Sequence, residues 1–264
     1  MIPGAYVQEW SAATPWPDPR QVEQDLIICR ALCDIFNEPF LAERLSFRGG
    51  TAINKLLFRQ PLRYSEDIDL VQVRPEPIGP TIDAIRRALS WLGPCRRRPA
   101  PHSTHLVFRG YSFSVENPWF AASTSIVSFE PEELFGTKLR ALLQRRNNRD
   151  LFDINEGLTQ LPLDPEKVVT CFHHYLAHEG TQITRANAEQ RMLAKLTRNL
   201  TDDIAPLLSA GVISGDAEAR EAFERVWFQL IARLSGTAWD RSEQVIEELR
   251  ATSIPNLLRS AGAS

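Results

Sequence analysis

The chain has 264 residues, 43% hydrophobic and 24% charged, so it is long enough to bury one large core or two modest ones. Its formal net charge of −3 argues against a protein that coats nucleic acid by bulk charge, although a local basic groove stays open. No apolar run approaches the roughly 20 residues that span a bilayer, and the first residues lack the basic and apolar regions of a signal peptide. We therefore expect a cytoplasmic protein that does not enter the membrane.

The first half of the chain mixes helical and strand patterns. Residues 1–18 are rich in proline and tryptophan and predict an extended arm. A helix is expected over 19–36, because Asp18 supplies an N-cap acceptor and Pro19 suits the first helical position. The elements expected next are a short helical piece at 39–44, a strand at 45–50, a short helix at 51–58, a strand at 67–73, an amphipathic helix at 78–93, a hairpin at 105–117 turning near Gly110, and a strand at 123–129.

From Pro131 onward the pattern is helical throughout. Polar breaks separate six segments with helical periodicity, at 131–146, 149–161, 164–180, 184–200, 216–234 and 240–252. An α/β front half followed by an all-helical back half predicts two lobes, residues 1–130 and 131–264. The expected fold class is α/β (α+β), with a mixed β-sheet core, flanking helices and a helical C-terminal lobe.

Three carboxylates crowd into four residues of "RYSEDIDLV". Side chains alternate along a strand, so Asp67 and Asp69 are expected on one face and Glu66 on the other. Two unpartnered carboxylates at this spacing repel each other. A magnesium or manganese ion held between them removes the repulsion, since both ions favour carboxylate oxygens. The pair therefore predicts a metal site for phosphoryl or nucleotidyl transfer, with a solvated surface turn as the alternative.

A glycine pair precedes these acids, in "FRGGTAINK". Gly49 and Gly50 let the backbone approach a phosphate, and the helix start at Thr51 aims N–H groups at it. Neither a dinucleotide fingerprint nor a Walker A loop is present, and a plain tight turn is the alternative. With Asp67 and Asp69 following 16 and 18 residues after Thr51, the segment predicts a triphosphate cradle beside a metal pair. Arg63 and Ser65, which flank the acids, are candidate phosphate contacts. We expect Ser65 to be a polar contact rather than a nucleophile.

The order glycine pair, short helix and D-x-D is similar to that of the polymerase-β-like nucleotidyltransferase superfamily. More closely, "FRGGTAINKLLF" and "LRYSEDIDLV" resemble the AbiEii/AbiGii toxin family of nucleotidyltransferases, with Ile53 in place of the more usual leucine. A second block, "PEELFGTKLRALLQRRNNRDLFDI", extends the resemblance to about residues 20–160. The two blocks occur in the family's order.

The resemblance implies functional roles for Lys138, Asp150 and Asp153 in the second block. Helical spacing puts Lys138 on the inward, apolar face, where an ammonium needs an anion, and a nucleotide phosphate is the expected one. A lysine at the edge of that face is the alternative. Of the two aspartates, Asp153 is the expected catalytic residue. Asp150 could instead pair with a nearby arginine, which would be Arg145, Arg146 or Arg149.

Members of the superfamily usually take a third carboxylate from a neighbouring strand. Glu116 in "YSFSVEN" occupies the corresponding place, although Ser114 stands where the family tends to have lysine and Pro118 follows the asparagine. Glu116 is therefore a candidate third acid.

The resemblance implies a magnesium-dependent toxin of a toxin–antitoxin or phage-defence system. Such an enzyme would transfer NMP from an NTP to an acceptor, with the 3′ end of tRNA as the leading expectation, and would have a cognate antitoxin protein. The alternatives are a protein or small-molecule acceptor and an inactive NTP-binding module. The charge run Arg96–Arg98 is either solvated or a contact for an RNA backbone.

Overall fold

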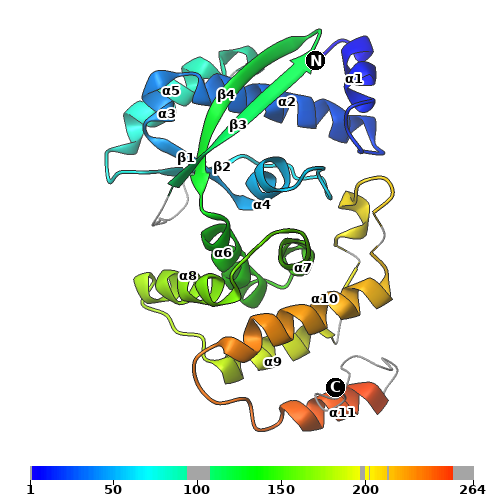
Figure 1. Cartoon of the computed structure of the whole chain (residues 1–264). Helices are drawn as coiled ribbons and strands as arrows, with labels where there is room; N and C mark the ends of the chain where they lie inside the picture. Colours follow the sequence, from blue (N-terminus) through cyan, green and yellow to red (C-terminus); the bar gives the residue numbers. More distant parts are fainter. Residues whose placement is uncertain (1, 94–107, 197–199, 202, 213, 252–264) are drawn as a thin grey trace. The chain divides into compact units, whose positions relative to one another are not determined.

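The computed structural model describes residues 2–93, 108–196, 200–201, 203–212 and 214–251 (Figure 1). The chain forms two compact units, Met1–Glu130 with Ser209–Val212, and Pro131–Leu208 with Ile213–Ser264. Each lobe was expected to be one continuous stretch of sequence. Residues 209–212 differ from this expectation, because they come from the second half of the sequence but belong to the first unit. The charge run at 96–98 lies outside the described residues.

The strands described in the first unit form one mixed sheet of four, in the order β2-β1-β4-β3. β1 (Leu45–Arg48) is antiparallel to β2 (Asp69–Gln72) and parallel to β4 (Phe120–Phe129). β4 in turn pairs antiparallel with β3 (Phe108–Asn117). This arrangement confirms the expected mixed sheet. A parallel pair cannot be joined by a tight turn, and the chain between β1 and β4 contains strands β2 and β3 as well as helical segments.

Helix α2 (Pro19–Phe36) carries the core of the first unit. It begins as predicted, with the Asp18 side chain accepting a hydrogen bond from Arg20 N at 2.9 Å. Figure 1 shows it running along the β3–β4 hairpin, and its apolar side packs with Phe47 of β1 and Ile126 of β4. The remaining helical elements between the strands are α3 (Pro39–Ala42), α4 (Gly49–Ala52), the π-helix η1 (Ile53–Leu57), α5 (Ile78–Ala88) and the 3₁₀ turn η2 (Ser90–Leu92).

The N-terminal segment differs from the expected extended arm, because residues 4–11 form helix α1 (Gly4–Ser11). Val7 and Trp10 of this helix pack on a cluster that includes Leu26 of α2 and Val115 of β3. A two-turn helix is marginal by itself, so this apolar contact stabilises it more than local propensity does. The abundance of proline and tryptophan in residues 1–18 favoured an extended arm packed onto the body, and the structure differs in making part of that arm helical.

The hairpin also differs from the prediction, which placed its turn near Gly110. β3 continues through Gly110, which pairs with Val127, and the chain reverses at Pro118 and Trp119. The Asn117 side-chain oxygen accepts from Trp119 N at 2.9 Å, a local bond that favours a turn. Asn-Pro was thus the stronger turn signal, and the glycine was accommodated within the strand.

The second unit is helical among its described residues, as predicted. Its α-helices are α6 (Pro131–Gln144), α7 (Arg149–Gln160), α8 (Pro165–His178), α9 (Arg185–Leu196), α10 (Asp216–Gln229) and α11 (Ser242–Ala251), with 3₁₀ turns η3 (Ala205–Leu207) and η4 (Ile231–Arg233). A Cβ added to Gly136 of α6 would lie 2.7 Å from Cys171 Cβ of α8, so this glycine lets the two helices approach closely. None of the helices described is long and apolar enough to cross a membrane.

Candidate active site

The turn after β1 brings a backbone atom against a carboxylate of the predicted metal pair. Gly49 has φ of +80°, a conformation that L side chains rarely adopt. A Cβ at this position would lie 1.9 Å from Asp69 Oδ2 and 3.0 Å from Asp69 Cβ. The glycine is therefore required twice, for its backbone conformation and for the space that the exposed Asp69 side chain occupies.

The other predicted ligand, Asp67, lies before β2 rather than within it. The pairing of β1 with β2 ends at Arg48 and Asp69, because the chain turns into α4 at Gly49 and leaves no partner strand for Asp67. Its carbonyl oxygen instead accepts from Thr51 Oγ1 at 2.5 Å. The expected strand at 67–73 was therefore wrong at its start, and strand alternation does not determine the direction of the Asp67 side chain.

Thr51 and Ser65 bond to each other instead of standing apart. Thr51 Oγ1 lies 2.7 Å from Ser65 Oγ, and the Thr51 side chain is buried. With its second bond to the carbonyl of Asp67, Thr51 fastens the glycine turn to the segment that carries the acids. In the structure the Thr51 hydroxyl thus positions Asp67, while the half-buried Ser65 hydroxyl lies beside it.

Asn54, which the sequence analysis missed, holds the same turn from the opposite side. Its Nδ2 donates to Gly50 O at 3.0 Å, and its Oδ1 accepts from Leu62 N at 3.2 Å and Arg63 N at 3.3 Å. The Arg63 side chain is only 3% exposed and donates to Tyr64 O. Arg63 therefore supports the loop from inside, and the structure does not present it at the surface for a phosphate.

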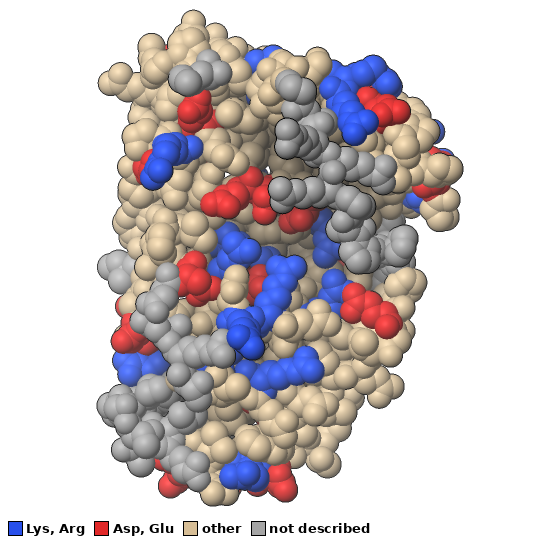
Figure 2. Space-filling view, turned by 180° about the vertical axis from the view of Figure 1, so that it is seen from behind, with Lys and Arg blue, Asp and Glu red and all other residues tan. Residues whose placement is uncertain are grey.

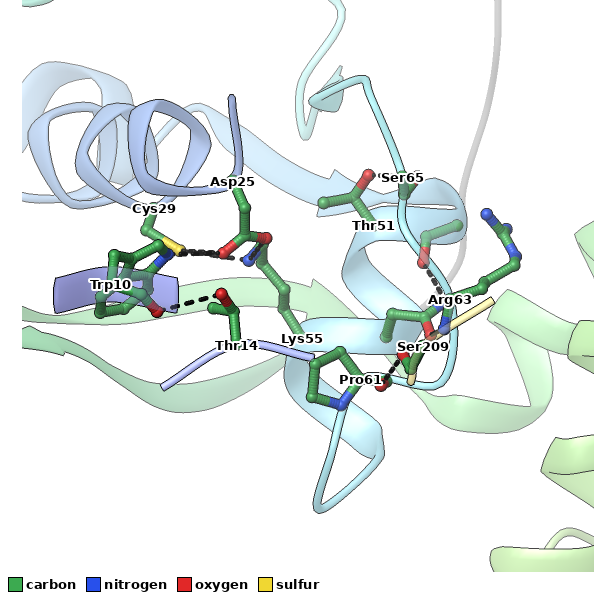
Figure 3. Close-up of polar contacts among 12 residues, drawn as sticks. Trp10, Thr14, Asp25, Cys29, Thr51, Lys55, Pro61, Arg63, Ser65 and Ser209 are labelled. Atoms are coloured by element: carbon green, nitrogen blue, oxygen red, sulfur yellow. Dashed lines mark hydrogen bonds and ion pairs between the residues drawn. The ribbon is translucent and has the colours of Figure 1, made fainter. Parts of the chain in front are cut away.

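A buried polar cluster fixes the helical segment after the glycines onto α2 (Figure 3). Lys55 Nζ lies 2.7 Å from Asp25 Oδ1 and 3.1 Å from Cys29 Sγ, and Trp10 Nε1 donates to Asp25 Oδ2 at 3.1 Å. Burial works against the charge of Lys55, but Cys29 and Asp25 more than offset it, and the lysine pKa is raised. A signal for the cluster was available, since Asp25 shares the apolar face of Val22 and Cys29 and needs a cation there.

The Cys29 thiol makes this cluster sensitive to alkaline pH. Burial raises its pKa from 9.0 to about 12. Below pH 9 the thiol is protonated in both the folded and unfolded chain, so its contribution to stability is complete. Between pH 9 and about 12 only the unfolded chain loses the proton, so the free energy of unfolding falls as pH rises.

We expect this loss to be at most about 1.4 kcal/mol per pH unit for one proton, and to be shallower in Cys29→Ala. Urea unfolding of the two proteins between pH 8 and 11 measures the difference. Equal slopes would contradict the assignment to Cys29.

In the second unit, Lys138 of α6 meets two carboxylates of α7. Its Nζ lies 2.8 Å from Asp150 Oδ1 and 2.6 Å from Asp153 Oδ2. Lys138 is 9% exposed and the two aspartates 1% each. Lys138 thus does emerge toward the interior, and Asp150 pairs with this lysine rather than with an arginine. Asp150 Oδ2 has no hydrogen-bond partner among the described residues, so one oxygen of this buried carboxylate is unsatisfied there.

The structure does not bring Glu116 to Asp69. The sheet places Arg109 level with Ser128, and Ser128 level with Phe47, next to the residue that pairs with Asp69. Glu116 lies opposite Ala121, seven residues farther along β3 than Arg109. At about 3.3 Å per residue, these seven residues put Glu116 about 23 Å farther along the strand than Arg109. The expectation of a third acid at Glu116 is therefore contradicted by the strand register, which depends on the true position of the hairpin turn.

The chemistry of the donors tests whether a divalent ion fits. Within the described parts of the chain, no group of three or more His, Cys, Asp or Glu is arranged to hold a metal ion. Magnesium, however, is commonly held by one or two carboxylates together with substrate phosphates, and keeps several waters. Asp67 and Asp69 are both exposed and meet that requirement, so the residues present fit a metal that arrives with its nucleotide.

The fold defines the class of protein. It is similar to the nucleotidyltransferase toxin MenT4 from Mycobacterium tuberculosis H37Rv, with a TM-score of 0.58 and 15% sequence identity, over 95% of this chain and 99% of that one. The chain thus has a nucleotidyltransferase fold.

Sequence comparison then identifies the family. Residues 30–93 and 97–232 match the family described as "Nucleotidyl transferase AbiEii toxin, Type IV TA system", and the chain belongs to that family. Among curated proteins, no sequence matches it. The resemblance seen in the sequence is confirmed, and the chain is a nucleotidyltransferase toxin of a type IV toxin–antitoxin system.

One prediction arises directly from the turn at Gly49. Gly49→Ala is expected to lower nucleotidyl transfer at least about tenfold, because the new methyl group displaces the Asp69 carboxylate. Gly93→Ala is the matched control, since Gly93 also has positive φ, +88°, but an added Cβ would meet no described residue within 4 Å. Both variants bear the backbone cost of about 1–2 kcal/mol. Equal activities of the two variants in a transfer assay would show that the contact with Asp69 does not matter.

Proposed function

We propose that the protein transfers NMP from an NTP to the 3′ end of tRNA in the cytoplasm, with magnesium or manganese, and that a cognate antitoxin counters it. The proposal rests on one observation: the Asp69 carboxylate packs directly against the Cα of Gly49, in the space that a Cβ would fill. A glycine turn suited to phosphate and an exposed acid suited to a metal are thereby part of one structure. Membership of the AbiEii family supports the same activity.

We assign Asp67 and Asp69 to hold the divalent ion, and the turn at Gly49 and Gly50 to receive the triphosphate. A bound divalent ion supplies positive charge that offsets the charge developing on the phosphate oxygens. Thr51 keeps Asp67 in place through its backbone carbonyl. Ser65, next to Thr51, is proposed as a polar contact at the same turn.

We assign Lys138 to a nucleotide phosphate, with Asp150 and Asp153 orienting its ammonium. A lysine ammonium has three donors, and the two aspartates take two of them. The third is left for a phosphate oxygen. Asp153 is proposed as the catalytic member of the pair, following the resemblance in this block.

In the proposed reaction, the 3′ hydroxyl oxygen of the acceptor forms a bond to the α-phosphorus. The bond from that phosphorus to the bridging oxygen of the pyrophosphate breaks, and pyrophosphate leaves with both electrons. The hydroxyl proton passes from the acceptor oxygen to solvent water as the new bond forms. Positioning and charge stabilisation account for most of the catalysis in such a transfer.

The test incubates the protein with each α-labelled NTP in turn, Mg²⁺ and total RNA. We expect label on a band of tRNA size with one NTP or a subset of them, and none in the presence of EDTA. Periodate-treated RNA, which lacks a 3′ hydroxyl, is the matched control and should remain unlabelled. Absence of label on RNA, or label on periodate-treated RNA, would contradict the proposal, and label on protein or a small molecule would redirect it.

A further inference from the structure

The second unit contains a groove where the end of α6 meets α9. It has a volume of about 630 Å³, and its lining includes Gln144, Arg145, Arg146, Gln182, Arg191 and Lys195. All charged residues of the lining are cations, although the whole chain has 33 acidic residues against 30 lysines and arginines. Figure 2 shows acidic and basic side chains interspersed on the face that it draws. A lining without a carboxylate therefore departs from the rest of the chain.

Two cations of α9 build the floor of this groove. Lys195 Nζ donates to Arg145 O at 2.9 Å and Asn147 O at 3.2 Å, and Arg191 Nη1 donates to Leu143 O at 3.2 Å. The last carbonyls of a helix have no partner within it, so the bond from Arg191 satisfies Leu143 O in the last turn of α6. The bonds from Lys195 satisfy two carbonyls just after that helix. The two cations also offset the negative end of the helix dipole, which would otherwise repel an anion.

The exposed arginines above this floor have no carboxylate partner within the described residues. Arg145 and Arg146 are exposed, and Arg191 uses one of its five donors for Leu143 O. Some other arginines of the unit do pair with carboxylates, as Arg185 does with Glu189 and Arg233 with Glu166. The groove thus offers guanidinium groups whose charge is not neutralised by the protein.

From this arrangement we infer that the α6–α9 groove binds the phosphodiester backbone of the RNA acceptor. The inference rests on the proposed function, which supplies RNA as the acceptor. Guanidinium groups bind phosphate oxygens in pairs, and several of them along one groove suit a chain of phosphates. The lining has no aromatic residue on which a base could stack. Recognition is therefore of the backbone and independent of sequence, and a chain of net charge −3 needs such a local site to hold RNA.

The test measures the affinity of the full-length protein for a fluorescent tRNA by anisotropy, without NTP or metal. Arg145→Glu/Arg146→Glu is expected to weaken binding at least about tenfold at moderate salt. The slope of log affinity against log salt is expected to fall by about 1.4, since each lost contact with single-stranded RNA contributes about 0.7. Lys167→Glu/Arg241→Glu, which makes the same charge change at exposed positions of the same unit, is the control and should change affinity less than twofold.

A second measurement distinguishes RNA from the nucleotide. The KM for NTP at saturating RNA is expected to be unchanged in the groove variant, while the KM for RNA rises. An unchanged RNA affinity, an equal loss in the control, or a rise confined to the KM for NTP would each overturn the inference. Because binding is measured without NTP, an inactive wild-type protein whose RNA affinity still depends on these arginines would contradict only the proposed function.

Discussion

Asp69→Asn is expected to reduce nucleotidyl transfer at least about 100-fold, because changes outside the metal ligands already cost up to about that much. The substitution keeps the shape of the side chain that lies on Gly49 and removes only its charge. The fold should be retained, since Asp69 is exposed. The measurement is the initial rate of labelling of RNA at saturating NTP, over a range of Mg²⁺ concentrations.

Glu66→Gln is the matched control for this prediction. Glu66 is an exposed acid three residues from Asp69, and its change removes the same charge from the same segment. We expect it to keep more than half of the activity. If the two variants lost activity equally, the effect would belong to the general field of the segment rather than to a ligand.

Lys138→Met is expected to lower the free energy of unfolding by about 3–5 kcal/mol, the usual cost of removing one partner from a buried ion pair. The lysine lies within 3 Å of Asp150 and Asp153, and its loss removes the ammonium that both buried carboxylates contact. Equilibrium unfolding in urea measures the change.

The unsatisfied oxygen of Asp150 makes a rescue experiment possible. Adding Asp150→Asn to Lys138→Met should restore part of the lost stability, because Asp150 Oδ2 has no hydrogen-bond partner within the described residues. Lys167→Met, at an exposed position of α8, is the control and should change stability by less than about 0.5 kcal/mol. A double variant no more stable than Lys138→Met would contradict the role of the carboxylates.

Local patterns in the sequence predicted most of the elements. The N-cap at Asp18, the glycine turn at Gly49 and the helices after Pro131 each depend on residues close together in the chain. The two blocks that carried the resemblance both lie within the residues that match the family. These features needed no knowledge of tertiary contacts.

The remaining features depend on contacts that span the chain. The expectation that Glu116 lies near Asp69 failed because the hairpin turn is eight residues from its predicted place at Gly110. A strand register has no local signature in the sequence. Asp67 was predicted in a strand but lies before β2, because the neighbouring strand β1 ends at Arg48 and offers it no partner. Long-range packing also buried Arg63, a candidate phosphate contact, and paired Lys55 with Asp25.

Residues 209–212 give the first unit a discontinuous boundary, with consequences for how the gene can be divided. Ser209 N donates to Leu62 O at 3.0 Å, its Oγ donates to Pro61 O at 2.5 Å, and Ala210 N donates to Pro15 O at 2.9 Å. A fragment or gene fusion that breaks after residue 130 removes two donors from the loop just before Ser65 and Asp67, and a third from Pro15 in the N-terminal segment. Residues 1–130 therefore cannot be exchanged between relatives as a separate unit. A recombinant has to keep them together with the matching segment 209–212.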